Sequence, residues 1–201
     1  MTATVAANSA ATNQMLTVQE LEQARQFLKL TETAVVGATK GLTEAQWSFK
    51  PAPDRWSIAE NLDHAVTVQE RVLGPILSQL AEAPPPPAGW DYQRADSIVI
   101  HQFGTRLSRF PSPEFVRPQG STAPAELLQR LAANYARFVH ILETTPGLRQ
   151  HAIEAPPLKA ISKGVFPLAD GYQWILAVAA HTERHVKQML EVMADSAYPV
   201  R

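Results

Sequence analysis

The 201-residue sequence contains no cysteine, and this absence removes several kinds of chemistry at once. Without a thiolate the chain has no disulfide, no nucleophilic sulfur of its own, and no zinc or iron–sulfur site that depends on cysteine ligands. A metal site must then be built from His, Asp, Glu or water. The sequence offers six histidines for that purpose.

A strong charge of either sign is also lacking, because 18 Lys+Arg stand against 19 Asp+Glu and leave a formal net charge of −1. Domains that bind nucleic acids usually carry a basic face, so we expect no nucleic-acid partner. Charged residues make up only 18% of the chain, which disfavours long acidic tails. The apolar fraction of 45% is sufficient to form the core of one domain.

Long hydrophobic runs are absent as well, so we expect no membrane-spanning segment and no membrane partner. Residues 1–14 are mostly Ala, Thr and Asn and have neither the basic residues nor the apolar stretch of a signal peptide. We interpret them as a disordered tail. The sequence thus predicts a cytoplasmic protein with one domain over residues 15–195 and a short C-terminal tail over residues 196–201.

Two helices are marked at their start by a capping box, in which Ser or Thr is followed three residues later by Glu. One pair is Thr17 with Glu20, and the other is Ser57 with Glu60. The first predicts a helix over residues 17–41, and the second predicts a helix from residue 57 that ends before the prolines at 84–87. Pro75 lies inside the second helix, where it should bend or break it.

Two further helices are predicted from apolar residues that recur at helical spacing over residues 122–145 and 168–194. Between the helices, residues 97–109 favour a short helix, whereas residues 110–118 and 147–167 look irregular. No run combines β-branched alternation with a hairpin turn, so we expect no strands. The fold class that follows is all-α, a four-helix bundle with irregular, Pro-rich connections.

His181 and His185 are the most informative pair of histidines, because they stand four residues apart on a predicted helix and therefore share one face. Two imidazoles in that arrangement can bind one metal ion. The metalloprotease pattern HExxH is absent, since Thr182 follows His181. The same spacing also occurs in helices without a metal, so spacing alone leaves both interpretations open.

A third ligand has to come from another segment. His64 lies on the second predicted helix and borders its apolar side, but for a lone histidine a packed or surface imidazole is the favoured interpretation. The remaining histidines have no partner at helical spacing, and we interpret them as structural. They are His101, His140 and His151.

The histidines lie within two sequence motifs, WSIAENLDH over residues 56–64 and HTERHVKQ over residues 181–188. These resemble the W-S-I-x-E-x-L-x-H and H-x-x-R-H-x-x-Q patterns of the DinB-like superfamily. The Pro-Glu pair at 113–114 and the P-x-G pattern at 118–120 are similar to the middle of the same group. The resemblance extends from about Leu16 to Met193.

This resemblance implies a four-helix bundle with a divalent metal ion held by three histidines, which correspond here to His64, His181 and His185. Zinc is the first expectation, with nickel, iron or manganese as alternatives. Characterised members include transferases that use bacillithiol or mycothiol and a mycothiol-dependent maleylpyruvate isomerase. Others are described as metal-dependent hydrolases or stress-associated proteins, and many are dimeric, so a homodimer is also an expectation.

Four functions remain open at this stage. The first is a metal-dependent enzyme that activates a small-molecule thiol for transfer, with the thiol as its partner, and the second is a metal-dependent hydrolase. The third is a metal-binding stress-response module without turnover, and the fourth is a bundle whose histidines are structural. The proline run at 84–87 could bind a partner, although a rigid connector is the simpler interpretation.

No catalytic residue is assigned, but several neighbours of the histidines are candidates for supporting roles. Glu60 is already explained by its capping box, and Asp63 is expected to face solvent because it points about 100° away from His64. Arg184 could bind a substrate carboxylate or form a surface ion pair, and Gln188 lies one turn beyond it. The tryptophans are expected to anchor the core rather than to bind substrate: Trp47, Trp56 and Trp174.

Overall fold

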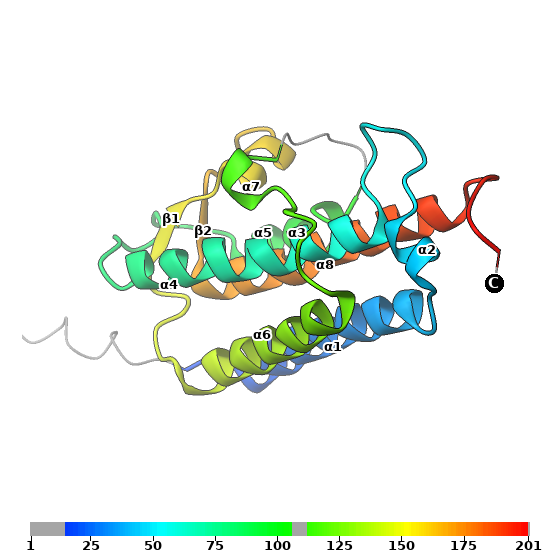
Figure 1. The fold of residues 1–201 in the computed structure, drawn as a ribbon. Helices are drawn as coiled ribbons and strands as arrows, with labels where there is room; N and C mark the ends of the chain where they lie inside the picture. The colour runs from blue at the N-terminus through cyan, green and yellow to red at the C-terminus, as the bar shows by residue number, and fades with distance from the viewer. Residues whose placement is uncertain (1–14, 106–111, 201) are drawn as a thin grey trace, which may run out of the picture.

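The computed structural model describes residues 15–105 and 112–200, and its long helices form a four-helix bundle (Figure 1). Three bundle members are α1 (Val18–Thr39), α6 (Pro124–Thr144) and α8 (Gly171–Met193). The remaining member consists of α3 (Ile58–Val68), the π-helical turn η1 (Gln69–Leu73) and α4 (Gly74–Leu80) in succession. Helix α8 packs against α1 and α3, and α6 packs against the same two helices. The predicted all-α bundle is thereby confirmed.

Shorter elements lie around this bundle. They are α2 (Glu44–Ser48), α5 (Tyr92–Gln102), the 3₁₀ turn η2 (Glu114–Val116), α7 (Pro156–Ile161), β1 (Ala152–Glu154) and β2 (Leu168–Asp170). Helix α5 packs on α8, and α7 contacts α5 and β2. In Figure 1, α7 lies on the side of α8 that is opposite to α1 and α6.

The core is formed by apolar side chains that recur every three or four residues on each bundle helix. On α6 the buried residues are Leu127, Leu131, Tyr135, Phe138 and Leu142. Burying a side chain of this size stabilises the fold by about 1.5–3 kcal/mol relative to leaving it in water. The helix predicted over residues 122–145 is therefore confirmed, and its periodic apolar residues form the face of α6 that packs against the core.

Both predicted capping boxes are present and fix the starts of α1 and α3. At α3 the backbone N–H of Ser57 donates to Glu60 Oε2 at 2.7 Å, and the N–H of Glu60 donates to Ser57 Oγ at 3.1 Å. Sequence reasoning missed two more boxes, in which the acid at the third position is replaced by Gln. They are Thr43 with Gln46 at α2, and Asp170 with Gln173 at α8.

The expectation that the chain has no strands is wrong. β1 and β2 pair antiparallel, with Ala152 opposite Asp170 and Glu154 opposite Leu168. Each strand is three residues long, too short to show alternation, and the two are joined through α7 rather than through a hairpin turn. The strand β2 also shifts the start of α8 from residue 168 to Gly171, because Asp170 is its N-cap.

Pro75 interrupts the second bundle helix as predicted. The regular α-helix ends at Val68, and the π-helical turn η1 precedes α4, in which Pro75 is the second residue. Proline cannot donate a backbone hydrogen bond, and wide turns of this kind are a usual way for a helix to accommodate the lost bond. The helix continues beyond the break to Leu80.

The short helix expected over residues 97–109 is present in part and begins earlier than expected, and residues 106–109 of that range lie outside the described residues. Helix α5 begins at Tyr92 because Asp91 caps it, accepting the backbone N–H of Arg94 at 3.0 Å, and it ends at Gln102. Residues 147–167, expected to be irregular, contain β1 and α7.

The predicted tail at residues 1–14 lies outside the described residues. At the other end, the chain lies against α2: Gln46 Nε2 donates to the carbonyl oxygen of Pro199 at 2.9 Å, and the ring of Tyr198 meets Phe49 edge-on at 5.6 Å. The division into one domain and two tails stays a prediction. Among residues 15–105 and 112–200, no helix is long and apolar enough to cross a membrane.

Candidate metal centre

The structure brings His64, His181 and His185 together. His64 projects from α3 and the other two from α8, and these two helices pack against each other. One ring nitrogen from each residue lies within 4.8 Å of the others, so the three could hold one metal ion. The ring centroids are 4.5–5.2 Å apart. The i, i+4 spacing on α8 accounts for two of these positions, and the α3–α8 contact supplies the third.

The His64 ring is oriented by the backbone of η2. Its Nδ1 lies 2.6 Å from the carbonyl oxygen of Val116. A carbonyl oxygen can only accept a hydrogen bond, so Nδ1 carries the proton and Nε2 keeps its lone pair. Burial lowers the pKa of His64, against the opposing effects of the Val116 bond and of Asp63. The neutral ring is therefore favoured, as a metal ligand requires.

The His185 ring is oriented by Asn61, a residue that sequence reasoning did not single out. The amide nitrogen of Asn61 donates to the carbonyl oxygen of Ser57 at 2.8 Å, which leaves Oδ1 to accept from His185 Nδ1 at 3.1 Å. With its proton on Nδ1, His185 carries its ring lone pair on Nε2. Side chains that hold the second nitrogen of a metal-binding histidine usually fix its tautomer and orientation. The position of Asn61, one turn before His64, was the available signal.

His181 completes the cluster, and its distance from His185 is compatible with two ligands of one metal ion. Its Nε2 lies 3.1 Å from His185 Nε2. Two nitrogens that bind one tetrahedral ion at ~2.0–2.1 Å are themselves roughly 3.3 Å apart. The Nδ1 of His181 is buried and has no hydrogen-bond partner within the described part of the chain. Burial, aided by His64 and Arg184, lowers the pKa of His181 to about 3, so this ring is neutral too.

Asp63 does not face solvent as expected, and this prediction is wrong. Its side chain is buried, and Oδ2 accepts the backbone N–H groups of Gln119 at 2.8 Å and Gly120 at 3.2 Å. The loop after η2 covers this face of α3, an arrangement that helical periodicity alone cannot reveal. Asp63 thereby fastens the segment that carries the Val116 carbonyl, the partner of His64.

Trp56 lies just before the start of α3 and covers one side of the cluster. Its ring centroid lies 4.8 Å from that of His64 and 6.0 Å from that of His185, with the latter pair stacked. Trp47 packs against the hydrophobic core as expected. Trp174 packs there too, but it also lines a groove beside the histidines. The ring of Trp56 instead packs against the histidines, where it excludes water from one side of the site.

A groove of about 1100 Å³ opens onto the three histidines. Its walls come from α3, α4, α7 and α8, from the end of α5 and from the segment around η2. Pockets for small molecules usually measure about 300–1,000 Å³, so this groove is large enough for a substrate. An ion held by three nitrogens leaves further coordination positions open, and here they would face the groove.

The other candidates have different surroundings. Both carboxylate oxygens of Glu60 are engaged, one by the Ser57 N–H and one by Lys50 Nζ at 2.9 Å, which confirms its capping role. Arg184 lines the groove and donates to the backbone oxygen of Thr105. Gln188 also lines it, and its buried Oε1 has no donor among the residues described.

The three remaining histidines are not part of the cluster. His101 and His140 are exposed, and the Nδ1 of His151 meets the carbonyl oxygen of Ala83. The interpretation that they are structural stays a prediction.

The comparisons with known proteins agree with this geometry. The model of the DinB superfamily matches residues 28–189, which span α1 to α8 and include all three histidines. No curated protein matches the chain. Among solved structures it is similar to YfiT from Bacillus subtilis, described as a probable metal-dependent hydrolase with an unusual four-helix bundle topology. The TM-score is 0.59 at 13% identity over 92% of this chain and 91% of that one, a likeness that shows the fold. The chain belongs to the DinB superfamily.

Proposed function

We propose that the protein is a metal-dependent hydrolase of a small molecule, with one divalent ion held by His64, His181 and His185. The observation that carries this proposal is the convergence of three imidazoles at a groove large enough for a substrate. Three nitrogen ligands suit zinc first, and nickel, iron or manganese next. When bound in this way, such an ion polarises a substrate carbonyl and lowers the pKa of water to about 7.

The chain's own residues would orient the reacting groups. Val116 and Asn61 fix the rings of His64 and His185 so that each directs Nε2 at the same point. Trp56 closes one side of that point to solvent. The overall reaction adds the oxygen of water to the acyl carbon and transfers a proton to the leaving oxygen or nitrogen. The description of YfiT as a probable metal-dependent hydrolase supports the same reaction class.

Transfer of a small-molecule thiol is the second candidate, and the size of the groove favours it. About 1100 Å³ is room for two small molecules, a thiol and its acceptor, to lie beside the histidines together. The chain contains no cysteine, so the reacting sulfur would have to arrive with the substrate. A thiol near a bound divalent ion loses its proton readily, and the thiolate is the nucleophile.

Metal content and turnover test the proposal together. We expect untagged protein to hold about one divalent ion per chain, and His64→Ala and His181→Ala to lose most of it. His140→Ala, which removes an exposed histidine from α6, is the matched control and should keep the ion. Stoichiometric metal in both site variants would refute the ligand assignment.

Activity then separates the candidates. Metal-loaded protein is assayed with a panel of aryl esters and amides, and separately with small thiols and monochlorobimane, before and after removal of the metal. Metal-dependent cleavage supports the hydrolase, and metal-dependent conjugation supports the transferase instead. Metal binding without either activity would support a non-catalytic metal-binding module.

A further inference from the structure

The groove beside the histidines has two chemically different ends. On α8 the lining residues before His181 are apolar or aromatic, and those after it include charged and amide side chains. The first set is Trp174, Ala177 and Val178; the second includes Arg184, Gln188 and Glu191. At ~1.5 Å per residue, Trp174 lies about 10 Å along the helix axis from His181 on one side, and Gln188 lies as far on the other.

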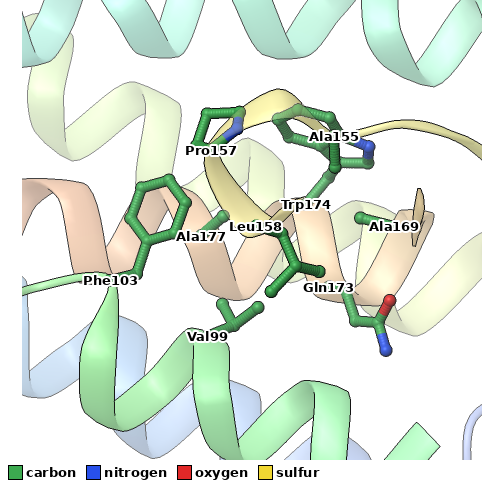
Figure 2. Close-up of a pocket in the computed structure, with 9 residues that line it drawn as sticks. All are labelled: Val99, Phe103, Ala155, Pro157, Leu158, Ala169, Gln173, Trp174 and Ala177. Carbon is green, nitrogen blue, oxygen red and sulfur yellow. The ribbon is translucent and has the colours of Figure 1, made fainter. Parts of the chain in front are cut away.

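Other elements continue the apolar end. Ile76 of α4, Phe103 after α5 and Pro157 of α7 line the same groove. Phe103, Pro157, Trp174 and Ala177 also border a small cavity of about 10 Å³ beneath α7, and Figure 2 shows them arranged around it. Its remaining lining is almost entirely apolar, with Val99, Leu158 and Ala169 among the side chains. This end of the groove is therefore lined by apolar side chains from α4, α7 and α8.

The polar end offers charges and an unused acceptor. Arg55 and Glu191 form an ion pair at 3.4 Å at its edge. The buried Oε1 of Gln188 accepts no hydrogen bond from any described residue, although a buried carbonyl oxygen normally has a donor. A ligand with an N–H or O–H group at this end would supply that donor.

We propose that the groove selects an amphipathic substrate, an apolar acyl or aryl group joined through the reacting bond to a polar group that carries a hydrogen-bond donor. The apolar group lies between α7 and α8 against Phe103, Pro157 and Trp174. The reacting bond lies at the histidines, and the polar group lies toward Gln188 and Arg184. The position of the reacting bond rests on the proposed function. The positions of the two ends rest on the residues that line the groove.

Alkyl hydroxamates test the apolar end through binding, because their head group binds metal ions and their chain length can be varied. Calorimetry on zinc-loaded protein compares acetohydroxamate with hexanohydroxamate. A methylene wholly removed from water improves affinity about fourfold, so four of them give an upper limit of about 250-fold. Because the groove is open, we expect hexanohydroxamate to bind at least about tenfold more tightly. Equal affinities would overturn the proposal.

Two substitutions locate the effect. Ala177→Phe should fill the apolar end and reduce the gain from chain length to about threefold or less while acetohydroxamate still binds. Trp174→Ala removes a wall instead of filling the space, so it tests the same end if the bulkier variant fails to fold. Arg55→Ala, at the polar edge, is the control and should keep the gain. A full gain in both apolar-end variants would overturn the assignment.

The same experiment separates this inference from the proposed function. Binding of acetohydroxamate without a chain-length effect would leave the metal site in place and refute only the apolar end. If acetohydroxamate does not bind, the ion is not open to a ligand as the proposed function requires, and the apolar end is judged by octanohydroxamate alone. Its binding to wild-type protein but not to Ala177→Phe would then support the apolar end, and absence of binding would refute it.

Discussion

Replacement of Asp63 by Ala gives the sharpest test of how the loop after η2 supports the histidines. The carboxylate accepts two backbone N–H groups, from Gln119 and Gly120, and is itself buried. A hydrogen bond to a charged group contributes about 1.5–3 kcal/mol, and these donors are only partly buried. We therefore expect a loss of about 2–4 kcal/mol in the free energy of unfolding, or roughly 5–15 °C in Tm.

The substitution should also act on the metal centre. Once Gln119 and Gly120 are released, the Val116 carbonyl no longer has a fixed position, and the His64 ring loses the partner that orients it. Loss of such an indirect support usually weakens metal binding by about 10–100-fold. Hydrogen-exchange mass spectrometry of residues 112–121 and zinc titration against a chelator measure the two effects.

Two controls make this result interpretable. Asp63→Asn keeps an acceptor oxygen and should fall between the wild type and Asp63→Ala in both measurements. Asp91→Ala removes the N-cap of α5, so it should cost stability without faster exchange at residues 119–120. Unchanged exchange in Asp63→Ala would refute the anchoring of the loop. Faster exchange with wild-type zinc affinity would refute its link to His64.

Three further predictions concern stability. Zinc at 100 times its Kd should add about 2.7 kcal/mol to the free energy of unfolding and raise Tm by roughly 5–11 °C, as measured by scanning calorimetry. We expect this rise in the wild type and in His140→Ala but not in His64→Ala. An equal rise in His64→Ala would contradict bridging of α3 and α8 by the ion. Arg149→Leu removes the cation between Asp96 and the fully buried Asp170. It should lower the free energy of unfolding, measured in urea, by about 3–5 kcal/mol. A wild-type urea midpoint would show that these ion pairs are dispensable. Hydrogen bonds from Arg130 hold the pKa of Glu70 below its usual value, so the stability from this pair is present above about pH 4.3 and is lost as pH falls through the lower pKa of the folded state. Because both side chains are a third exposed, Glu70→Gln should reduce that acid-dependent loss by at most about 1 kcal/mol, and identical urea midpoints for the two proteins from pH 5 to 3 would contradict it.

The long helices could be predicted because the forces that define them act within a few residues. The capping boxes at Thr17 and Ser57 satisfy the first N–H groups locally, so their sequence pattern is sufficient evidence. The same logic extends to Asp170 with Gln173, and a search that allowed Asp and Gln would have placed the start of α8 correctly. The strands could not be found in this way, since each exists only through its partner across α7.

The candidate site, too, could be predicted only in part from the sequence. The spacing of His181 and His185 placed two rings on one face, but it took the resemblance to a family to join His64 to them. The residues that orient the rings were missed for a physical reason. Val116 acts through its backbone carbonyl, which any residue type would supply, and Asp63 acts on a loop more than fifty residues away in sequence.

The two helices that carry the histidines also form part of the core. On α3, Ile58 and Leu62 are fully buried core residues, whereas Asn61, His64 and Val68 follow each other at helical spacing along the groove. On α8, Ile175, Ala179 and Met189 belong to the core, and Trp174, His181 and Gln188 recur along the groove. Ala177, Val178 and Val192 belong to both the core and the groove lining. A helix with both faces covered is hydrophobic or buried nearly all round, as α8 is. The core thus helps to fix the distance between α3 and α8, and with it the relative positions of the histidines.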